Sequence, residues 1–138
     1  MIVYLDSSVV LAKVLKEPGA MASWGEWEMA ISSSLTQVEL ARTFARYRAL
    51  GKMSDEEFAF AQTSTRRHMQ ATRQVPLRVR VLRRAAGPFP AIVRTLDAIH
   101  LSTALLWQED TGEDLTFLTH DRQLRIAAQA CGLATSKS

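Results

Sequence analysis

The sequence of 138 residues contains one cysteine, Cys131, so no disulfide can form within the chain. A lone cysteine fits the reducing cytoplasm, and we expect Cys131 to be a buried, inert thiol. No apolar run approaches the roughly 18 residues that a membrane-spanning helix needs. Residues 1–5 lack a basic side chain and Asp6 interrupts the first apolar run, so no signal peptide is expected. The length and the hydrophobic content of 47% predict one cytoplasmic globular domain, residues 1–138.

Acidic residues are missing from the middle of the chain. Between Phe58 and Leu96 there is no Asp or Glu, but there are these arginines: Arg66, Arg67, Arg73, Arg78, Arg80, Arg83, Arg84 and Arg94. The remainder carries 9 basic and 14 acidic residues, so the net charge of +3 conceals a basic region. Arginine suits two-pronged contacts with phosphate, which makes nucleic acid the expected partner. A solvated helix face or an acidic protein partner would also account for this charge.

Strand-like and helix-like segments alternate along the chain. Short apolar runs predict strands at residues 2–5, 29–33, 72–77, 115–119 and 133–135. Helical periodicity and capping residues predict helices at residues 7–16, 20–28, 36–50, 78–86, 95–107 and 122–130, with another from residue 54 through Arg66 and Arg67. Two capping boxes are expected, at residues 36–39 and 54–57. Such alternation predicts an α/β fold with a mostly parallel sheet covered on both faces.

Four acidic residues stand just after a predicted strand or in the opening turn of a predicted helix: Asp6, Glu39, Asp97 and Asp121. Each has a structural explanation of its own, as a helix cap, as an arm of a capping box, or as a charge beside a helix dipole. In a parallel sheet, however, all these places lie at one edge. Four carboxylates gathered there would repel one another unless a cation neutralised them. Mg²⁺ and Mn²⁺ prefer carboxylate oxygens, so the pattern predicts a metal site able to activate water at a phosphodiester.

Five passages give the chain a resemblance to PIN-domain ribonucleases, and most to the VapC toxins of type II toxin–antitoxin modules. They are Ile2–Ser8, Ser33–Arg42, Asp55–Phe58, Leu96–Ala104 and Phe117–Leu124, in the order that the family has them. The resemblance implies a three-layer α/β/α sandwich and Mg²⁺- or Mn²⁺-dependent endoribonuclease activity. It also implies a homodimer and inhibition by a VapB-type antitoxin. The four acids match the family's acidic quartet, and Ser7 and Thr119 match the hydroxyl positions that usually support it.

The resemblance suggests a role for each site residue. Asp6 and Asp97 are expected to bind the metal directly, and Asp121 through water or at a second metal. Glu39 is expected to orient or deprotonate the attacking water, or to bind the metal through it.

For other basic residues and a histidine the roles are less defined by the sequence, and alternatives stay open for some of them. Arg42 either neutralises the acids or touches the scissile phosphate, or it is a surface arginine. His100 is expected to be a half-buried helix histidine rather than a ligand or proton carrier. RNA is expected to contact Arg66, Arg67, Arg83 and Arg84.

Other functions remain compatible with the sequence. A haloacid-dehalogenase-like phosphatase also uses an Asp after its first strand, although it normally has a second Asp where this chain has Ser8. A module that binds RNA or an antitoxin without cleaving RNA is the non-enzymatic alternative. The apolar residues Trp24, Trp27, Phe58 and Phe60 are expected to pair two copies of the chain or to receive an antitoxin helix. The sequence leaves open which RNA is cut and whether one or two metal ions are used.

Overall fold

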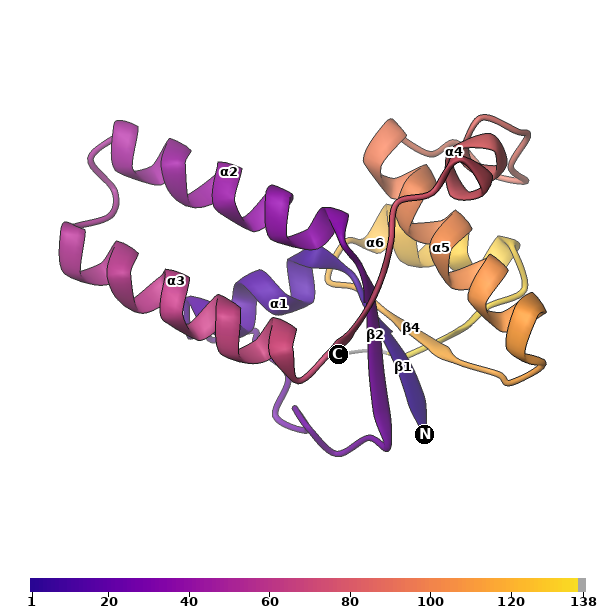
Figure 1. Ribbon diagram of the computed structural model, residues 1–138, viewed down its shortest axis with the longest axis horizontal. Helices are drawn as coiled ribbons and strands as arrows, with labels where there is room; N and C mark the ends of the chain where they lie inside the picture. Colours follow the sequence, from indigo (N-terminus) through magenta and orange to yellow (C-terminus); the bar gives the residue numbers. More distant parts are fainter. Residues whose placement is uncertain (137–138) are drawn as a thin grey trace.

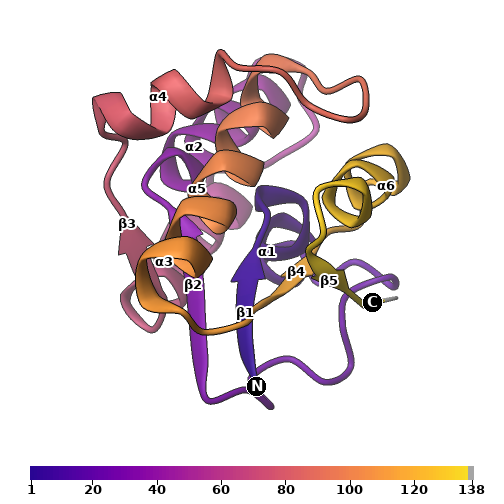
Figure 2. The same ribbon diagram turned by 90° about the vertical axis from the view of Figure 1, so that its right-hand side faces the viewer.

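The computed structural model describes residues 1–136, whose centre is a five-stranded sheet in the order β3-β2-β1-β4-β5 (Figure 2). All four neighbouring pairs of strands are parallel. The strands are β1 (Ile2–Leu5), β2 (Met29–Ser33), β3 (Arg73–Val75), β4 (Thr116–Leu118) and β5 (Ala134–Thr135). The predicted α/β class with a parallel sheet is confirmed.

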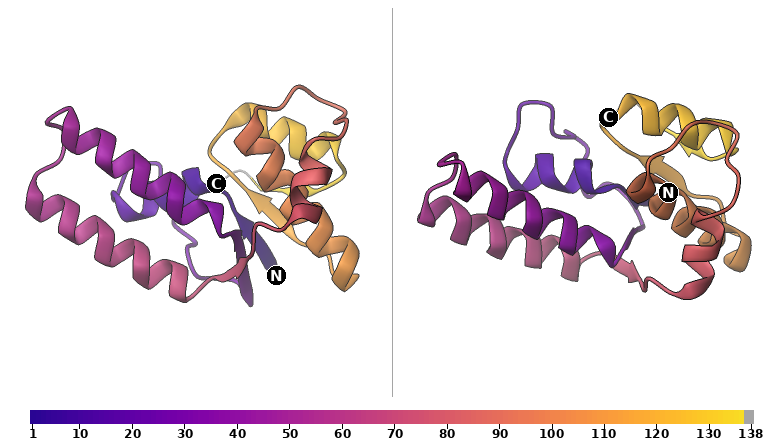
Figure 3. Two further views of the ribbon diagram at one scale, coloured as in Figure 1. Left: turned by 45° about the horizontal axis from the view of Figure 1, so that its top comes forward. Right: turned by 90° about the horizontal axis from the view of Figure 1, so that it is seen from above.

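Six helices within residues 1–136 surround the sheet: α1 (Ser7–Val14), α2 (Leu35–Ala49), α3 (Asp55–Gln70), α4 (Val79–Ala85), α5 (Thr95–Thr111) and α6 (Arg122–Ala130). Helices α2 and α3 run side by side in opposite directions and extend away from the sheet (Figures 1 and 3). Helix α4 packs on α5. None of the helices described is of a length and apolarity that would let it cross a membrane.

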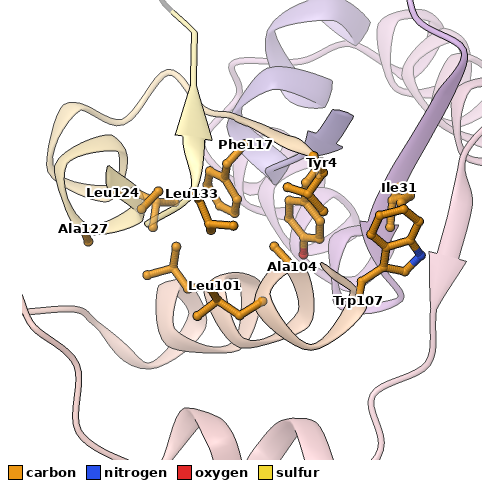
Figure 4. Packing of buried hydrophobic residues seen from close by; sticks show 12 residues of the cluster. Tyr4, Ile31, Leu101, Ala104, Trp107, Phe117, Leu124, Ala127 and Leu133 are labelled. Carbon is orange, nitrogen blue, oxygen red and sulfur yellow. The ribbon is translucent and has the colours of Figure 1, made fainter. Parts of the chain in front are cut away.

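Strand β1 shows why a short run of apolar residues becomes a central strand. Val3 and Leu5 are fully buried in one hydrophobic cluster, with residues of α1, α2 and α3. Tyr4 is fully buried in the other cluster, with residues of α5 and α6 (Figure 4). Alternate side chains of a strand point to opposite faces, so both faces must be covered for such a run to be buried. The three-layer α/β/α arrangement follows.

Two details of the predicted secondary structure are wrong. Residues 20–28 form turns instead of a helix, with Gly25 at a φ of +90°. Within this segment Trp24 and Trp27 pack edge to face, 5.1 Å between ring centroids, and both lie against the core of the same chain. The capping box at residues 36–39 does not form, because helix α2 begins earlier, after Ser34. Glu39 therefore lies inside the helix and its side chain is available to the site.

Two further helix starts agree with the sequence. Helix α5 begins at Thr95, as predicted, and Arg94 is the residue before its first turn. The capping box at Ser54 and Glu57 is present as predicted.

Of the four apolar residues expected at a partner surface, Phe60 is exposed, whereas Phe58 packs partly buried against the core. Cys131 is a free thiol that is only partly buried.

The order of the strands creates a crevice at the carboxyl ends of β1 and β4. From β1 the chain proceeds to β2 and β3 on one side, then crosses to β4 and β5 on the other. In open α/β sheets ligands bind at such a switch point, outside the carboxyl ends of the strands. Asp6 directly follows β1, and Thr119 directly follows β4.

Candidate active site

Asp6 is held in place by hydroxyl groups from the first turn of α1 and from the loop that follows β4. Its Oδ2 atom accepts hydrogen bonds from the hydroxyls of Ser8, at 2.7 Å, and Thr119, at 2.8 Å. The backbone N–H of Ser8 adds a longer bond to the same oxygen, so Asp6 also caps helix α1. The side chain is almost completely buried, and its residue is 4% exposed. One carboxylate oxygen is thereby fixed, while Oδ1 faces Nε2 of His100 at 3.8 Å.

Glu39 reaches the same place from helix α2. Its Oε2 accepts a hydrogen bond of 3.2 Å from the Ser7 hydroxyl, and its Oε1 lies 2.5 Å from Nε2 of His100. The expectation of a half-buried His100 is wrong, since this residue is 0% exposed. Burial lowers the pKa of His100, but the hydrogen bond with Glu39 and the charges of Asp6, Glu39 and Asp97 outweigh it and raise the pKa.

Asp97 and Asp121 lie on the other side of the crevice and share an arginine. The Arg94 guanidinium is 3.2 Å from Oδ2 of Asp121 and 3.6 Å from Oδ2 of Asp97. Asp121 also caps helix α6, because its Oδ1 accepts the N–H of Leu124. Burial raises the pKa of Asp97, and the charges of Asp6 and Asp121 raise it further, while Arg94 lowers it. These carboxylates therefore interact with one another across one site.

The surface beside the acids is hollowed. A hollow of about 420 Å³ is lined by Glu39, Arg94, Thr95, Leu96 and Asp97. It adjoins an apolar hollow of about 540 Å³ that shares Arg94 and Thr95 and is bordered by α4 and the start of α5. Solvent and a ligand can thus approach the carboxylates from the side of α5.

The sequence matches the family described as PIN domain over residues 3–129. The chain belongs to the PIN-domain family. Two relatives of this PIN domain come from Mycobacterium tuberculosis. Ribonuclease VapC47 is 30% identical over 142 residues, covering 97% of this chain and 95% of that protein. Ribonuclease VapC46 is 30% identical over 135 residues, covering 96% of this chain and 94% of that protein. The predicted resemblance to PIN-domain proteins of the VapC kind is confirmed.

Two solved structures share the fold of this PIN domain. A chain in the crystal structure of VapBC2 from Rickettsia felis, bound to a DNA fragment from its promoter, superposes with a TM-score of 0.67. The match covers 99% of this chain and 98% of that one at 13% identity. PAE2754 from Pyrobaculum aerophilum gives a TM-score of 0.65 and 20% identity, covering 99% and 84% of the two chains. At such identities the likeness supports the PIN-like sandwich itself.

PIN-domain ribonucleases generally use a divalent metal ion, and the acids of this chain fit one in type. Carboxylate oxygens are the donors that such hard cations prefer. Burial and the neighbouring charges of Asp6 and Asp121 raise the pKa of Asp97, and Arg94 places one cation between Asp97 and Asp121. Within residues 1–136, no three His, Cys, Asp or Glu side chains lie close enough together to coordinate one metal ion in their present rotamers. Binding would therefore require the carboxylates to adjust.

The supporting residues expected from the sequence are partly where they were predicted. Ser7 and Thr119 each donate a hydrogen bond to an acid of the site. Arg42 is exposed, and no ion pair joins it to an acid among the described residues. Sequence reasoning missed Ser8 and Arg94 as site residues. Their signal was spacing, because Ser8 lies two positions after Asp6 and Arg94 three before Asp97.

The arginine-rich stretch divides into paired and unpaired residues. Arg80 and Arg84 of α4 form two-pronged ion pairs with Asp110 and Glu109 of α5, respectively. These acids stand beyond the acid-free stretch in the sequence, and the fold brings them back beside it. Arg66, Arg67 and Arg83 are exposed, and no ion pair engages them within the residues described. Of the residues predicted to contact RNA, Arg84 thus already has a carboxylate partner.

Proposed function

We propose that this PIN domain is a divalent-metal-dependent endoribonuclease and the toxin of a VapBC-type pair. The observation that carries the proposal is the meeting of Asp6, Glu39, Asp97 and Asp121 at the carboxyl edge of the sheet. Asp6 and Glu39 each have one fully buried hydrogen-bond partner, Thr119 and His100 respectively, which is more than helix capping requires. Both M. tuberculosis relatives carry the name ribonuclease, in support.

Asp6, Asp97 and Asp121 are the residues that would hold Mg²⁺, or Mn²⁺ in its place. When bound, such an ion lowers the pKa of a coordinated water and stabilises the charge that develops on a phosphodiester. Glu39 retains acceptor capacity on both carboxylate oxygens, since each accepts only one hydrogen bond here. Its task in the reaction is to orient the attacking water and to receive its proton. Ser7, Ser8 and Thr119 keep the carboxylates in their rotamers.

RNA would approach along exposed arginines. Arg66, Arg67 and Arg83 are exposed, and their charges offset the repulsion between an acidic site and phosphate. Contacts of this kind position a strand without reading its sequence. Arg42 stands on the same helix as Glu39, three residues further on, and would contact phosphate only at the margin of the site.

The partners implied by the VapC kinship are a VapB-type antitoxin and a second copy of the chain, in the cytoplasm. The Rickettsia felis structure is named as a VapBC pair, which supports the first of these. Phe60 and other exposed apolar side chains offer surface for such contacts. Size measurement of the purified chain, alone and with the product of a neighbouring gene, tests both.

The activity is tested by incubating the purified chain with structured RNAs in EDTA, then with added Mg²⁺ or Mn²⁺. We expect internal cleavage only with metal, and none of a phosphate-monoester substrate. Ser8 stands where a dehalogenase-like phosphatase has its second Asp, and here it donates a hydrogen bond to Asp6. RNA binding without cleavage under every metal condition would favour a non-cleaving module, and monoester hydrolysis would favour the phosphatase.

A further inference from the structure

A chain of buried polar groups leads from the hydrophobic core to Glu39. The Tyr4 hydroxyl lies 2.7 Å from Nδ1 of His100, and Nε2 of the same ring lies 2.5 Å from Oε1 of Glu39. Tyr4 and His100 are both 0% exposed. The three residues come from β1, α5 and α2, so the chain of contacts ties together elements far apart in the sequence.

Tyr4 gives this chain of contacts a rigid base. Its ring stacks on Phe117 of the adjacent strand, with centroids 5.0 Å apart and planes 7° from parallel. It also meets the His100 ring edge to face at 5.8 Å. Figure 4 shows the Tyr4 hydroxyl directed toward helix α5, with the ring enclosed by core side chains. A ring packed in this way has no second rotamer to adopt, so its hydroxyl fixes the plane of the imidazole.

The hydrogen-bonding properties of Glu39 and Tyr4 determine which nitrogen of the His100 ring donates and which accepts. An ionised carboxylate only accepts hydrogen bonds, so Nε2 carries the hydrogen and donates to Glu39. Nδ1 then accepts from the Tyr4 hydroxyl when the ring is neutral, and donates to it when the ring is charged. Both ring nitrogens are engaged in either case, which leaves neither for a metal ion. His100 therefore acts on the site through Glu39, which lies 2.5 Å from Nε2, rather than through Asp6, whose Oδ1 lies 3.8 Å from the same nitrogen.

Glu39 needs such support because it is a long side chain that is costly to fix in one rotamer. Ser7 holds its Oε2 from α1, and His100 holds its Oε1 from α5. The two donors together set the plane of the carboxylate. Oriented donors of this kind typically change activity or metal affinity by roughly 10–100-fold when removed.

We propose that Tyr4 and His100 are positioning residues that fix the Glu39 carboxylate for its role with the attacking water. The proposal rests on the proposed ribonuclease function. It assigns to a core tyrosine and a fully buried histidine an effect on the rate of RNA cleavage. Both side chains are fully buried and cannot reach RNA at the surface, so we expect the effect on the chemical step rather than on binding.

Two substitutions of His100 separate its two contacts. In His100→Gln the side-chain amide replaces the Nε2 donor toward Glu39, and in His100→Asn it falls near the place of Nδ1, beside Tyr4. Both remove the ring and leave a similar gap, so each controls for the packing loss of the other. We expect His100→Asn to lower kcat roughly 10–100-fold with KM for RNA changed by less than about twofold. His100→Gln should recover most of that loss.

Tyr4→Phe removes only the hydroxyl from the base of the contacts and keeps the stacked ring. We expect kcat to fall about fivefold, as for the loss of one hydrogen bond. In the His100→Asn background the same substitution should bring no further loss, because its effect passes through the imidazole. Additive effects of the two substitutions would contradict a shared route to Glu39.

A spectroscopic readout tests the geometry without RNA. The chain has three histidines, so the imidazole ¹⁵N spectrum is simple, with His68 and His120 as internal references. We expect Nε2 of His100 to carry a slowly exchanging hydrogen whose signal shifts in Glu39→Gln and in Tyr4→Phe. Equal kcat in wild type, His100→Asn and Tyr4→Phe, while Asp6→Asn is inactive, would overturn the positioning role alone. An Asp6→Asn variant as active as wild type would instead overturn the ribonuclease proposal, whatever the spectrum gives.

Discussion

The Thr119 hydroxyl donates a hydrogen bond of 2.8 Å to Oδ2 of Asp6, across 113 positions of the sequence. The register of the sheet produces this contact. Leu5 of β1 pairs with Leu118 of β4, so the residue that follows each strand lies beside the other. The backbone N–H of Asp6 also donates to the carbonyl of Leu118. The site is therefore built by the pairing of two buried strands, and it forms when the sheet forms.

Thr119→Val tests what this hydroxyl contributes. Valine keeps the shape of threonine but removes the donor to Asp6 and the acceptor for the backbone N–H of Asp121. We expect RNA cleavage to fall about tenfold and the free energy of unfolding to fall by about 1 kcal/mol, because the partly buried N–H of Asp121 loses its partner. Thr119→Ser keeps the hydroxyl and should retain most activity. Equal rates in the valine and serine variants would exclude this role.

Arg94→Ala tests whether this arginine competes with metal for the acids. The guanidinium lies beside Asp97 and Asp121, so its removal frees two carboxylates. We expect calorimetric titration with Mn²⁺ to give about threefold to fivefold tighter binding, the modest effect of a largely exposed cation. Arg73→Ala removes the same charge from the edge strand β3 and serves as the control. Weaker Mn²⁺ binding in Arg94→Ala than in Arg73→Ala would contradict competition.

Adjacent arginines on α4 should behave differently. Arg83 is exposed, whereas Arg84 pairs with Glu109 through two hydrogen bonds. In a catalytically inactive background we expect Arg83→Ala to reduce the slope of log K for RNA against log salt by about one. Arg84→Ala should leave that slope nearly unchanged and reduce the free energy of unfolding by at most about 1 kcal/mol. The reverse pattern would show that Arg84 leaves its ion pair with Glu109 to bind RNA.

Ser54→Ala tests the cap of helix α3 away from the site. Ser54 and Glu57 exchange hydrogen bonds, which lower the pKa of Glu57. We expect the substitution to reduce the free energy of unfolding by about 1 kcal/mol. A depressed carboxyl pKa stabilises the fold above the ordinary pKa of Glu, and that part is lost as the pH falls through the folded-state pKa.

Thr63→Ala, on an exposed position of the same helix, is the control for the capping test. Denaturant unfolding at pH 7 and at acidic pH measures both variants. The alanine variant keeps the backbone N–H that donates to Glu57, so wild type and Ser54→Ala should both lose the Glu57 contribution as the pH falls. The stability difference between them should therefore persist in acid. Its disappearance there would show that the serine arm of the box depends on the ionised Glu57.

The sequence predicted the elements that are strongly marked by local patterns. Asp6 and Asp121 were placed after buried strands, and the capping interpretation of both is right, since each caps the helix that follows it. Their role as metal ligands stays a prediction. Residues 20–28 were misread because their apolar side chains mimic a helical pattern, while Gly25 takes a left-handed turn.

Features that depend on distant partners could not be predicted. Helical spacing places His100 near Asp97, but it cannot reveal that the Tyr4 hydroxyl lies within hydrogen-bond distance of the imidazole. Likewise, the acid-free stretch looked wholly basic, because the partners of Arg80 and Arg84 come from the next helix. Contacts between side chains of different elements depend on tertiary packing, so they cannot be predicted from the local sequence of either segment.

The most direct test of the account is cleavage of RNA by wild type and Asp6→Asn at equal concentration, with Mg²⁺ and with EDTA. Asparagine keeps the size of Asp6 and an acceptor for Ser8 and Thr119, but it removes one charge from the cluster. The account predicts metal-dependent cleavage by wild type, no detectable cleavage by Asp6→Asn, and an unfolding temperature of the variant in EDTA at or above that of wild type, because repulsion among the carboxylates is reduced. Full cleavage by a folded Asp6→Asn variant would contradict the assignment of these acids as a metal-dependent nuclease site.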